Sequence, residues 1–318
     1  MHGDAAQAHT CLGKTSQVAC IEKQGKSPSY LPCQPNELQG KRVAFYLLCA
    51  LALGLILMLL AQPWLRAYRQ RRVLTHPFPA YWRKVLQRRV PMLRRMPVDL
   101  QLQLKKRIQI FIAEKAFIGC DGLQVTEEMR VVIAAQACLL ILNRSMQHYA
   151  HVRQILVYPG AFVVQRTVTD GIGLQQDERQ ALSGESWSQG QVVLSWQDTL
   201  DGAAVVDDGR NVVLHEFAHQ LDQENGTAQG APPPTAGDTQ HNPERWKQVF
   251  SQAFADLQSQ ARRGEQGLFN HYGAQNPAEF FAVATETFFE QAAGMAEHYP
   301  ALYDELKAYY RVDPASWH

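Results

Sequence analysis

One stretch of this 318-residue chain limits its fold more than any other, because Val43 to Ala61 contains no charged side chain. Most of these 19 residues are Leu, Ala, Val, Phe or Ile. A helix of this length extends about 28 Å, which is enough to cross the hydrocarbon core of a bilayer. A core helix of a soluble protein would carry a polar stripe, and a signal peptide would end in a small-residue cleavage site that Leu60-Ala61-Gln62-Pro63 lacks. The stretch therefore predicts a transmembrane helix over residues 41–62.

Charge is distributed unevenly around this stretch. Residues 62–110 contain 13 basic side chains and one acidic side chain, Asp99, so this segment is +12 in a chain whose net charge is +1. The positive-inside rule then places everything after the span in the cytoplasm, with the basic segment against the anionic membrane surface. We expect a single-pass protein of the inner, cytoplasmic membrane, or a cytosolic protein if the start site is misassigned. The near-zero net charge gives no reason to expect direct nucleic-acid binding.

Patterning divides the chain into four parts. We expect a disordered tail at 1–40, the transmembrane helix at 41–62, a basic juxtamembrane linker at 63–79 and one catalytic domain at 80–315. Within that domain the pattern predicts helices over 80–143, 211–222 and 244–310, strands over 154–168 and 191–196, and a loop over 226–243. The buried helix within the first of these regions is expected at 131–142. The mixture indicates an α+β fold.

The most informative segment is Asn211 to Asp222, which contains His215-Glu216-Phe217-Ala218-His219. Residues four apart lie on the same face of a helix, so the two histidines can bind one zinc ion. Glu216 is rotated away from the two ligands and can take a proton from zinc-bound water as general base. Asp222 returns to the ligand face and is expected to accept a histidine N–H or another local hydrogen bond.

A catalytic zinc ion needs a third protein ligand. The downstream candidates are His241, His271, Glu279, Glu286 and His298. Asn276-Pro277-Ala278-Glu279 is typical of a helix start, so Glu279 could instead serve only as a capping residue. However, Glu279 and Glu286 lie on one stripe of an otherwise apolar helix, and a buried carboxylate needs a partner. The residues alone leave the choice among these candidates open.

The segments HEFAHQLDQENG and HYGAQNPAEFFAVATETFF resemble the Mlc titration factor (MtfA) family of zinc peptidases, which is similar to the catalytic domain of anthrax lethal factor. The resemblance extends over roughly residues 80–315. It implies a zincin-like, lethal-factor-like fold with one zinc ion per chain, held by His215, His219 and Glu279. It also implies that Glu216 is the general base and that Tyr272 stabilises the oxyanion. Glu286 is then expected to support the site without binding the metal.

The resemblance also suggests function and partners. It implies hydrolysis of a peptide or protein substrate, with aminopeptidase-type activity and a regulatory role. The alternative is a regulatory binding protein that sequesters a transcriptional repressor, like Mlc, of sugar phosphotransferase genes with little proteolysis. The apolar stretch and tail depart from the soluble family pattern. By analogy with other zincins we expect residues 193–196 to form the edge strand that pairs with substrate.

Overall fold

The computed structural model describes residues 37–169, 175–182, 184–187, 190–234 and 242–317. The chain forms two units, Met1–Arg66 and Ala67–His318. Most of the predicted tail, up to residue 36, lies outside the described residues, and residues 37–40 already belong to a helix. We treat the two units separately.

Helix α1 (Glu37–Leu74) contains the apolar stretch of the first unit. Within the described part of the chain it is one helix whose length and composition would allow it to cross a membrane, with a mean hydropathy of 2.8 over its richest window. Its large apolar side chains are exposed, Leu51 by 73%. The helix is longer than the predicted span, because it continues through Pro63 and the following arginines to Leu74.

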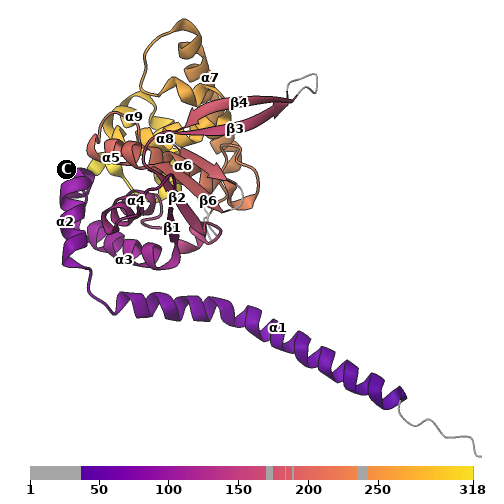
Figure 1. Ribbon diagram of the computed structural model, residues 1–318. Helices are drawn as coiled ribbons and strands as arrows, with labels where there is room; N and C mark the ends of the chain where they lie inside the picture. Colours follow the sequence, from indigo (N-terminus) through magenta and orange to yellow (C-terminus); the bar gives the residue numbers. More distant parts are fainter. Residues whose placement is uncertain (1–36, 170–174, 183, 188–189, 235–241, 318) are drawn as a thin grey trace, which may run out of the picture. The chain divides into compact units, whose positions relative to one another are not determined.

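The second unit contains most of the secondary structure (Figure 1). Its helices are α2 (Ala80–Arg89), α3 (Val98–Glu114), α4 (Glu127–Leu139), α5 (Trp196–Ala204), α6 (Val212–Asp222), α7 (Pro243–Arg263), α8 (Pro277–Glu290), α9 (Ala292–His298) and α10 (Pro300–Tyr310). Short 3-10 turns are η1 (Pro91–Arg94), η2 (Met146–Tyr149), η3 (Gln223–Asn225), η4 (His271–Ala274) and η5 (Pro314–Ser316). The strands are β1 (Ala116–Gly119), β2 (Gln154–Tyr158), β3 (Phe162–Thr169), β4 (Gln175–Leu182), β5 (Gly184–Trp187) and β6 (Gln191–Ser195). The unit is therefore mostly helical with a small sheet.

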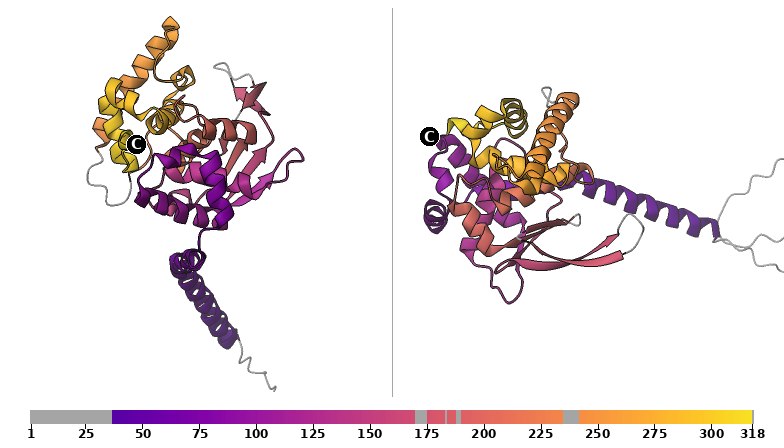
Figure 2. Two further views of the ribbon diagram at one scale, coloured as in Figure 1. Left: turned by 90° about the vertical axis from the view of Figure 1, so that its left-hand side faces the viewer. Right: turned by 90° about the horizontal axis from the view of Figure 1, so that it is seen from above.

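Four strands form a sheet in the order β1-β2-β6-β5. β1, β2 and β6 are parallel, and β5 pairs antiparallel with β6. β3 and β4 form a separate antiparallel hairpin, whose strands run side by side in Figure 1 and in the right-hand view of Figure 2. The expectation that residues 193–196 form an edge strand was wrong, since β6 lies between β2 and β5, and β5 is the outer strand on that side among the described residues.

Two further elements differ from the predicted pattern. β1 lies inside the region predicted to be helical, and α5 was not predicted. Four residues of β1 give too short a pattern to recognise, and pairing with β2 holds them extended. The predicted buried helix is confirmed as α4, whose residues Val131 to Leu139 are at most 1% exposed.

An aromatic cluster fixes α6 in the core. Phe217 on α6 packs against Tyr149 and Phe111, with ring centroids 5.0 and 5.7 Å apart. Each of these three side chains is fully buried. Burial of an aromatic ring removes about 150–250 Å² of surface from water, so this cluster anchors the helix that carries the histidines.

Helix α3 offers a matched test of this core. Leu104 is fully buried, whereas Leu102, two residues earlier, is 54% exposed. We expect Leu104→Ala to lower the free energy of unfolding by about 2–5 kcal/mol, and Leu102→Ala to change it by about 0.5 kcal/mol or less. Urea denaturation of both variants measures this, and equal effects would contradict the packing of α3.

Candidate metal centre

Helix α6 presents the histidines because its opposite face is buried. Asn211 caps the helix, since its Oδ1 accepts a hydrogen bond from the Leu214 backbone N at 3.0 Å. Val213, Leu214 and Phe217 are fully buried. Apolar burial of this face turns His215 and His219 toward α8.

Helix α8 is positioned in the same manner. Asn276 is its N-cap and accepts a hydrogen bond from the Glu279 backbone N at 3.0 Å, so the predicted helix start is confirmed. The aromatic residues of α8 are at most 4% exposed and pack against rings of α7 and α10. Their burial leaves the stripe that contains Glu279 and Glu286 to face α6.

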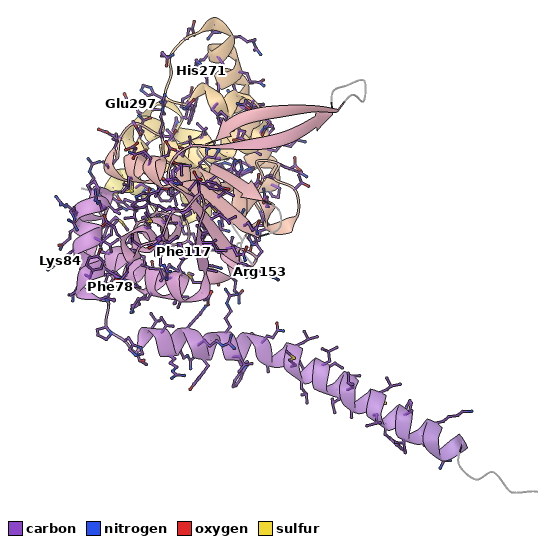
Figure 3. All side chains as sticks on the ribbon, viewed as in Figure 1. Phe78, Lys84, Phe117, Arg153, His271 and Glu297 are labelled. Atoms are coloured by element: carbon purple, nitrogen blue, oxygen red, sulfur yellow. The ribbon has the colours of Figure 1, made fainter. Side chains whose placement is uncertain are left out.

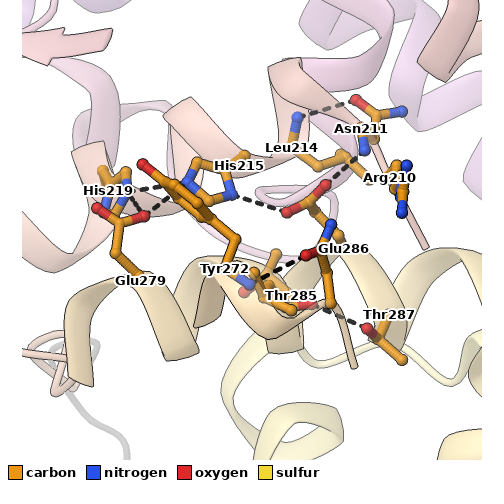
Figure 4. Close-up of polar contacts among 12 residues, drawn as sticks. Arg210, Asn211, Leu214, His215, His219, Tyr272, Glu279, Thr285, Glu286 and Thr287 are labelled. Atoms are coloured by element: carbon orange, nitrogen blue, oxygen red, sulfur yellow. Dashed lines mark hydrogen bonds and ion pairs between the residues drawn. The ribbon is translucent and has the colours of Figure 1, made fainter. Parts of the chain in front are cut away.

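Three donor atoms meet where the helices cross (Figure 4). His215 Nε2 lies 3.0 Å from Glu279 Oε2, His219 Nε2 lies 3.3 Å from the same oxygen, and the two Nε2 atoms are 3.2 Å apart. Ligands of a tetrahedral ion at about 2.0–2.1 Å lie about 3.4 Å from one another. The triangle therefore has the size that a divalent metal ion such as zinc requires.

The second nitrogen of His215 is held by Glu286. His215 Nδ1 donates to Glu286 Oε1 at 2.7 Å. With a hydrogen fixed on Nδ1, the ring could bind a metal ion only through Nε2, after the loss of any proton from that nitrogen. Glu286 thus lies at the opposite ring nitrogen from Glu279, where it holds the orientation of the imidazole.

The charges of the site favour a cation. Burial opposes ionisation of His215, but Glu286 and Glu279 outweigh it and raise the pKa of His215 well above its usual value. Burial likewise opposes ionisation of Glu279, but hydrogen bonds with His215 and His219 hold its pKa well below the usual range. Glu279 therefore carries its negative charge beside the two imidazoles, and a negative charge at that place attracts a cation.

Glu216 lies beside this triangle and is only 5% exposed. Among the described residues its Oε2 atom is buried without a hydrogen-bond partner. Burial raises the pKa of Glu216 to about 7, although the two histidines oppose the shift. A carboxylate with that pKa and an unused oxygen is suited to accept a proton near neutral pH.

Tyr272 comes from η4, the turn before α8. Its ring centroid is 5.7 Å from that of His215, and the side chain is 38% exposed. Figure 4 shows the ring beside His215 with its hydroxyl end directed toward His219. With this exposure the phenol is partly accessible to solvent beside the triangle.

The other candidate ligands lie elsewhere. His271 Nε2 lies 2.9 Å from the Glu265 backbone oxygen, and His298 is exposed at the end of α9. His241 lies outside the described residues. Asp222 accepts hydrogen bonds from the backbone N of Gly230 at 2.7 Å and of Ala231 at 3.0 Å, so its local contact is with the following loop.

The sequence did not predict the contacts of Asn211 with the carboxylates of α8, nor the part played by Glu290. The Asn211 backbone N donates to Glu286 Oε2 at 2.5 Å, and its Nδ2 donates to Glu290 Oε1 at 3.0 Å and to the Gly202 carbonyl at 3.1 Å. Burial raises the pKa of Glu290 to about 8, although Asn211 opposes the shift. Asn211 therefore joins the cap of α6 to two carboxylates of α8. The i, i+4 spacing of Glu286 and Glu290 on an apolar helix was the available signal.

Comparison with known proteins agrees with this geometry. A family described as glucose-regulated metallo-peptidase M90 matches residues 64–311. The chain belongs to the M90 metallopeptidase family. The protein is 31% identical to Mlc titration factor A of Yersinia pestis over 237 residues, which are 74% of this chain and 85% of the relative. It is also 36% identical to the uncharacterized protein slr2042 of Synechocystis sp. over 263 residues, which are 82% of this chain and 94% of the relative.

These matches confirm the resemblance to the Mlc titration factor family. An M90 peptidase domain implies a zincin-like fold and a divalent metal ion, for which His215, His219 and Glu279 form a suitable site. The M90 match starts at residue 64, after the apolar stretch. The shared domain is therefore essentially the second unit.

The Asn211 contacts generate a test of the metal site. Asn211→Asp keeps the oxygen that caps α6 but places a carboxylate oxygen against Glu290 and the Gly202 carbonyl. We expect zinc affinity to fall about 10-fold or more, as for other residues that orient metal ligands. Adding Glu290→Gln supplies an amide donor to the introduced carboxylate and should recover part of this loss. Competition with a chromogenic chelator measures the affinities.

The matched control is Asn242→Asp, because Asn242 caps α7 in the same way, with its Oδ1 accepting from the Glu244 backbone N at 3.1 Å. This variant should bind zinc like the unchanged protein. Equal affinities of all variants would show that Asn211 only caps a helix.

Proposed function

We propose that the chain is a zinc-dependent peptidase, anchored by a single transmembrane helix with its catalytic unit in the cytoplasm. The observation that carries the proposal is the triangle of two imidazole nitrogens and one carboxylate oxygen, 3.0–3.3 Å apart, beside a buried glutamate. Membership of the M90 metallopeptidase family supports it. A lethal-factor-like version of the zincin fold is part of this proposal.

His215, His219 and Glu279 would hold one zinc ion per chain. Two imidazoles and one carboxylate suit zinc better than magnesium or calcium, which prefer sites made of oxygen alone. When bound, zinc acts as a Lewis acid that polarises a peptide carbonyl group and makes a water molecule more acidic. Three protein ligands would leave a fourth position for water or substrate, and Glu216 and Tyr272 are the side chains proposed to act there.

The chain's own side chains perform the proton and charge chemistry. Glu216 accepts the proton of the attacking water and passes it to the leaving amine, for which its pKa of about 7 is suited. Tyr272 donates a hydrogen bond from its phenol to the oxyanion that forms at the scissile carbonyl. Glu286 keeps His215 in the orientation that this chemistry needs.

The edge strand β5 is the proposed docking strand for the substrate. β5 pairs with β6 on one side and, among the described strands, has no neighbour on the other. It also lies in contact with α6, the helix of the histidines. A peptide that adds to this edge would extend the sheet past the metal site. Aminopeptidase-type specificity is carried over from the family resemblance.

A regulatory binding protein is the second candidate function. It is favoured by the 31% identity to Mlc titration factor A, whose name describes the titration of Mlc. In this alternative the zinc fold captures a transcriptional repressor of sugar phosphotransferase genes with little proteolysis. Both functions require zinc, so they are separated by the role of Glu216.

Removal of Glu279 tests the ligand set. Glu279→Ala should lower the bound zinc well below one ion per chain, because two histidines alone leave the site incomplete. Elemental analysis after dialysis measures this, with thermal unfolding to verify that the variant is folded. Undiminished zinc would transfer the ligand assignment to Glu286.

Glu216→Gln separates the two functions. The amide cannot accept the proton, so we expect normal zinc content and a loss of peptide cleavage of about 100-fold or more. Glu224→Gln is the matched control. Glu224 lies on η3, the turn after α6, and its Oε2 is hydrogen-bonded to His148 Nδ1 at 2.8 Å. If the Glu216→Gln variant keeps the full biological effect of the unchanged protein, the binding function is favoured.

Topology is tested by a reporter fused after His318. The excess of basic residues after the span predicts activity of a reporter that works only in the cytoplasm. A reporter that requires the periplasm should stay inactive, and its activity would reverse the proposed orientation.

A further inference from the structure

An open groove of about 560 Å³ lies on the second unit, between the last two turns of α1, the turn before α2, and α3. Its walls are tied together by side-chain hydrogen bonds. Gln70 Nε2 donates to Glu114 Oε1 at 2.8 Å, and Gln109 Nε2 donates to the His76 carbonyl at 3.0 Å. Gln109 is itself only 9% exposed, so the groove has a fixed floor.

The lining of this groove is amphipathic. Arg69, Arg72 and Val73 have the spacing of one helix face and form one wall. Pro77, Trp82 and Ile112 supply apolar surface opposite them. A ligand that fits the groove therefore needs both an anionic part and an apolar part.

Electrostatics favour an anion over a neutral apolar ligand. Arg69 and Arg72 are exposed, and the residues that line the groove include no acidic side chain. Lys84 on α2 points outward nearby, with Phe78 in the preceding turn (Figure 3). Paired guanidinium groups three residues apart suit a phosphate, whose oxygens accept hydrogen bonds from both.

The place of the groove in the chain identifies the source of the phosphate. Residues 43–65 carry no charge, and Arg69 follows this stretch by four residues, or about 6 Å along a helix. The head-group layer on each side of a bilayer is about 5–8 Å deep. If the apolar stretch spans the membrane, as proposed above, the two arginines lie at the level of the lipid phosphates.

We propose that this groove is a binding site for one anionic glycerophospholipid. Its phosphodiester lies between the guanidinium groups of Arg69 and Arg72. Its glycerol and upper acyl segments lie against Val73, Trp82 and Ile112. The site would hold the base of the catalytic unit at the membrane surface, in addition to the span itself.

The test uses the full-length protein in detergent, titrated with phosphatidylglycerol or phosphatidylcholine, with bound lipid counted by native mass spectrometry. We expect preferential binding of one phosphatidylglycerol. Arg69→Gln/Arg72→Gln should weaken phosphatidylglycerol binding about 30-fold, because each basic residue near the membrane surface contributes about tenfold or less. Ile112→Ser should also weaken lipid binding without a change in charge. This result would distinguish binding in the groove from non-specific electrostatic attraction to basic residues.

Arg262→Gln/Arg263→Gln is the control, since it removes the same charge from the exposed end of α7. It should bind phosphatidylglycerol like the unchanged protein. Equal weakening in both double variants, or equal binding of the two lipids, would overturn the proposal. Displacement of the lipid by inorganic phosphate alone at matched concentration would also overturn it, because the apolar wall would then contribute nothing.

Flotation with phosphatidylcholine vesicles keeps the two membrane proposals distinguishable. Arg69→Gln/Arg72→Gln should still float, because its span is unchanged. If the unchanged protein does not float, the proposed transmembrane helix is refuted. The lipid titration in detergent would still test the proposed lipid site in the groove.

Discussion

Ionisable side chains buried between α6 and α8 impose the constraint on which the rest of the second unit depends. His219, Glu216 and Glu286 are at most 8% exposed, and each such group is costly to bury unless it is partnered. The two helices must therefore cross with His215 between Glu279 and Glu286, one carboxylate at each ring nitrogen. The aromatic faces that bury the opposite sides of these helices hold them at that crossing.

The crossing also gives a physical reason why a metal ion would complete the proposed site. Three donor atoms converge to within 3.3 Å of one another, and close approach of two imidazole nitrogens is unfavourable unless a proton or a cation lies between them. Asn211 ties the start of α6 to Glu286 and Glu290, so the register of the helices and the orientation of the imidazole depend on one buried amide. The proposed metal binding would therefore depend on the same hydrogen bonds that hold the helix crossing.

The sequence indicated which side chains come together wherever one helix contained the information. The i, i+4 spacing of His215 and His219 places both on one face, and the capping pattern before Glu279 gives the start of α8. Spacing alone could not choose between Glu279 and Glu286, because both lie on the stripe that faces α6. Each imidazole has two nitrogens that need partners, and only the helix crossing decides which carboxylate meets which nitrogen.

Strand order was less predictable because it depends on pairing between distant segments. The apolar pattern of β6 was recognised, but the adjacent β5 (Gly184–Trp187) has no alternating apolar pattern, so its pairing was missed and β6 was taken for the edge. The fold and the proposed chemistry meet in one central claim, that zinc is held by two histidines and one carboxylate. X-ray absorption at the zinc edge of the full-length protein tests it most directly. The account predicts two imidazoles with nitrogen and oxygen ligands at about 2.0–2.1 Å. A sulfur ligand at about 2.3 Å, or fewer than two imidazoles, would contradict it.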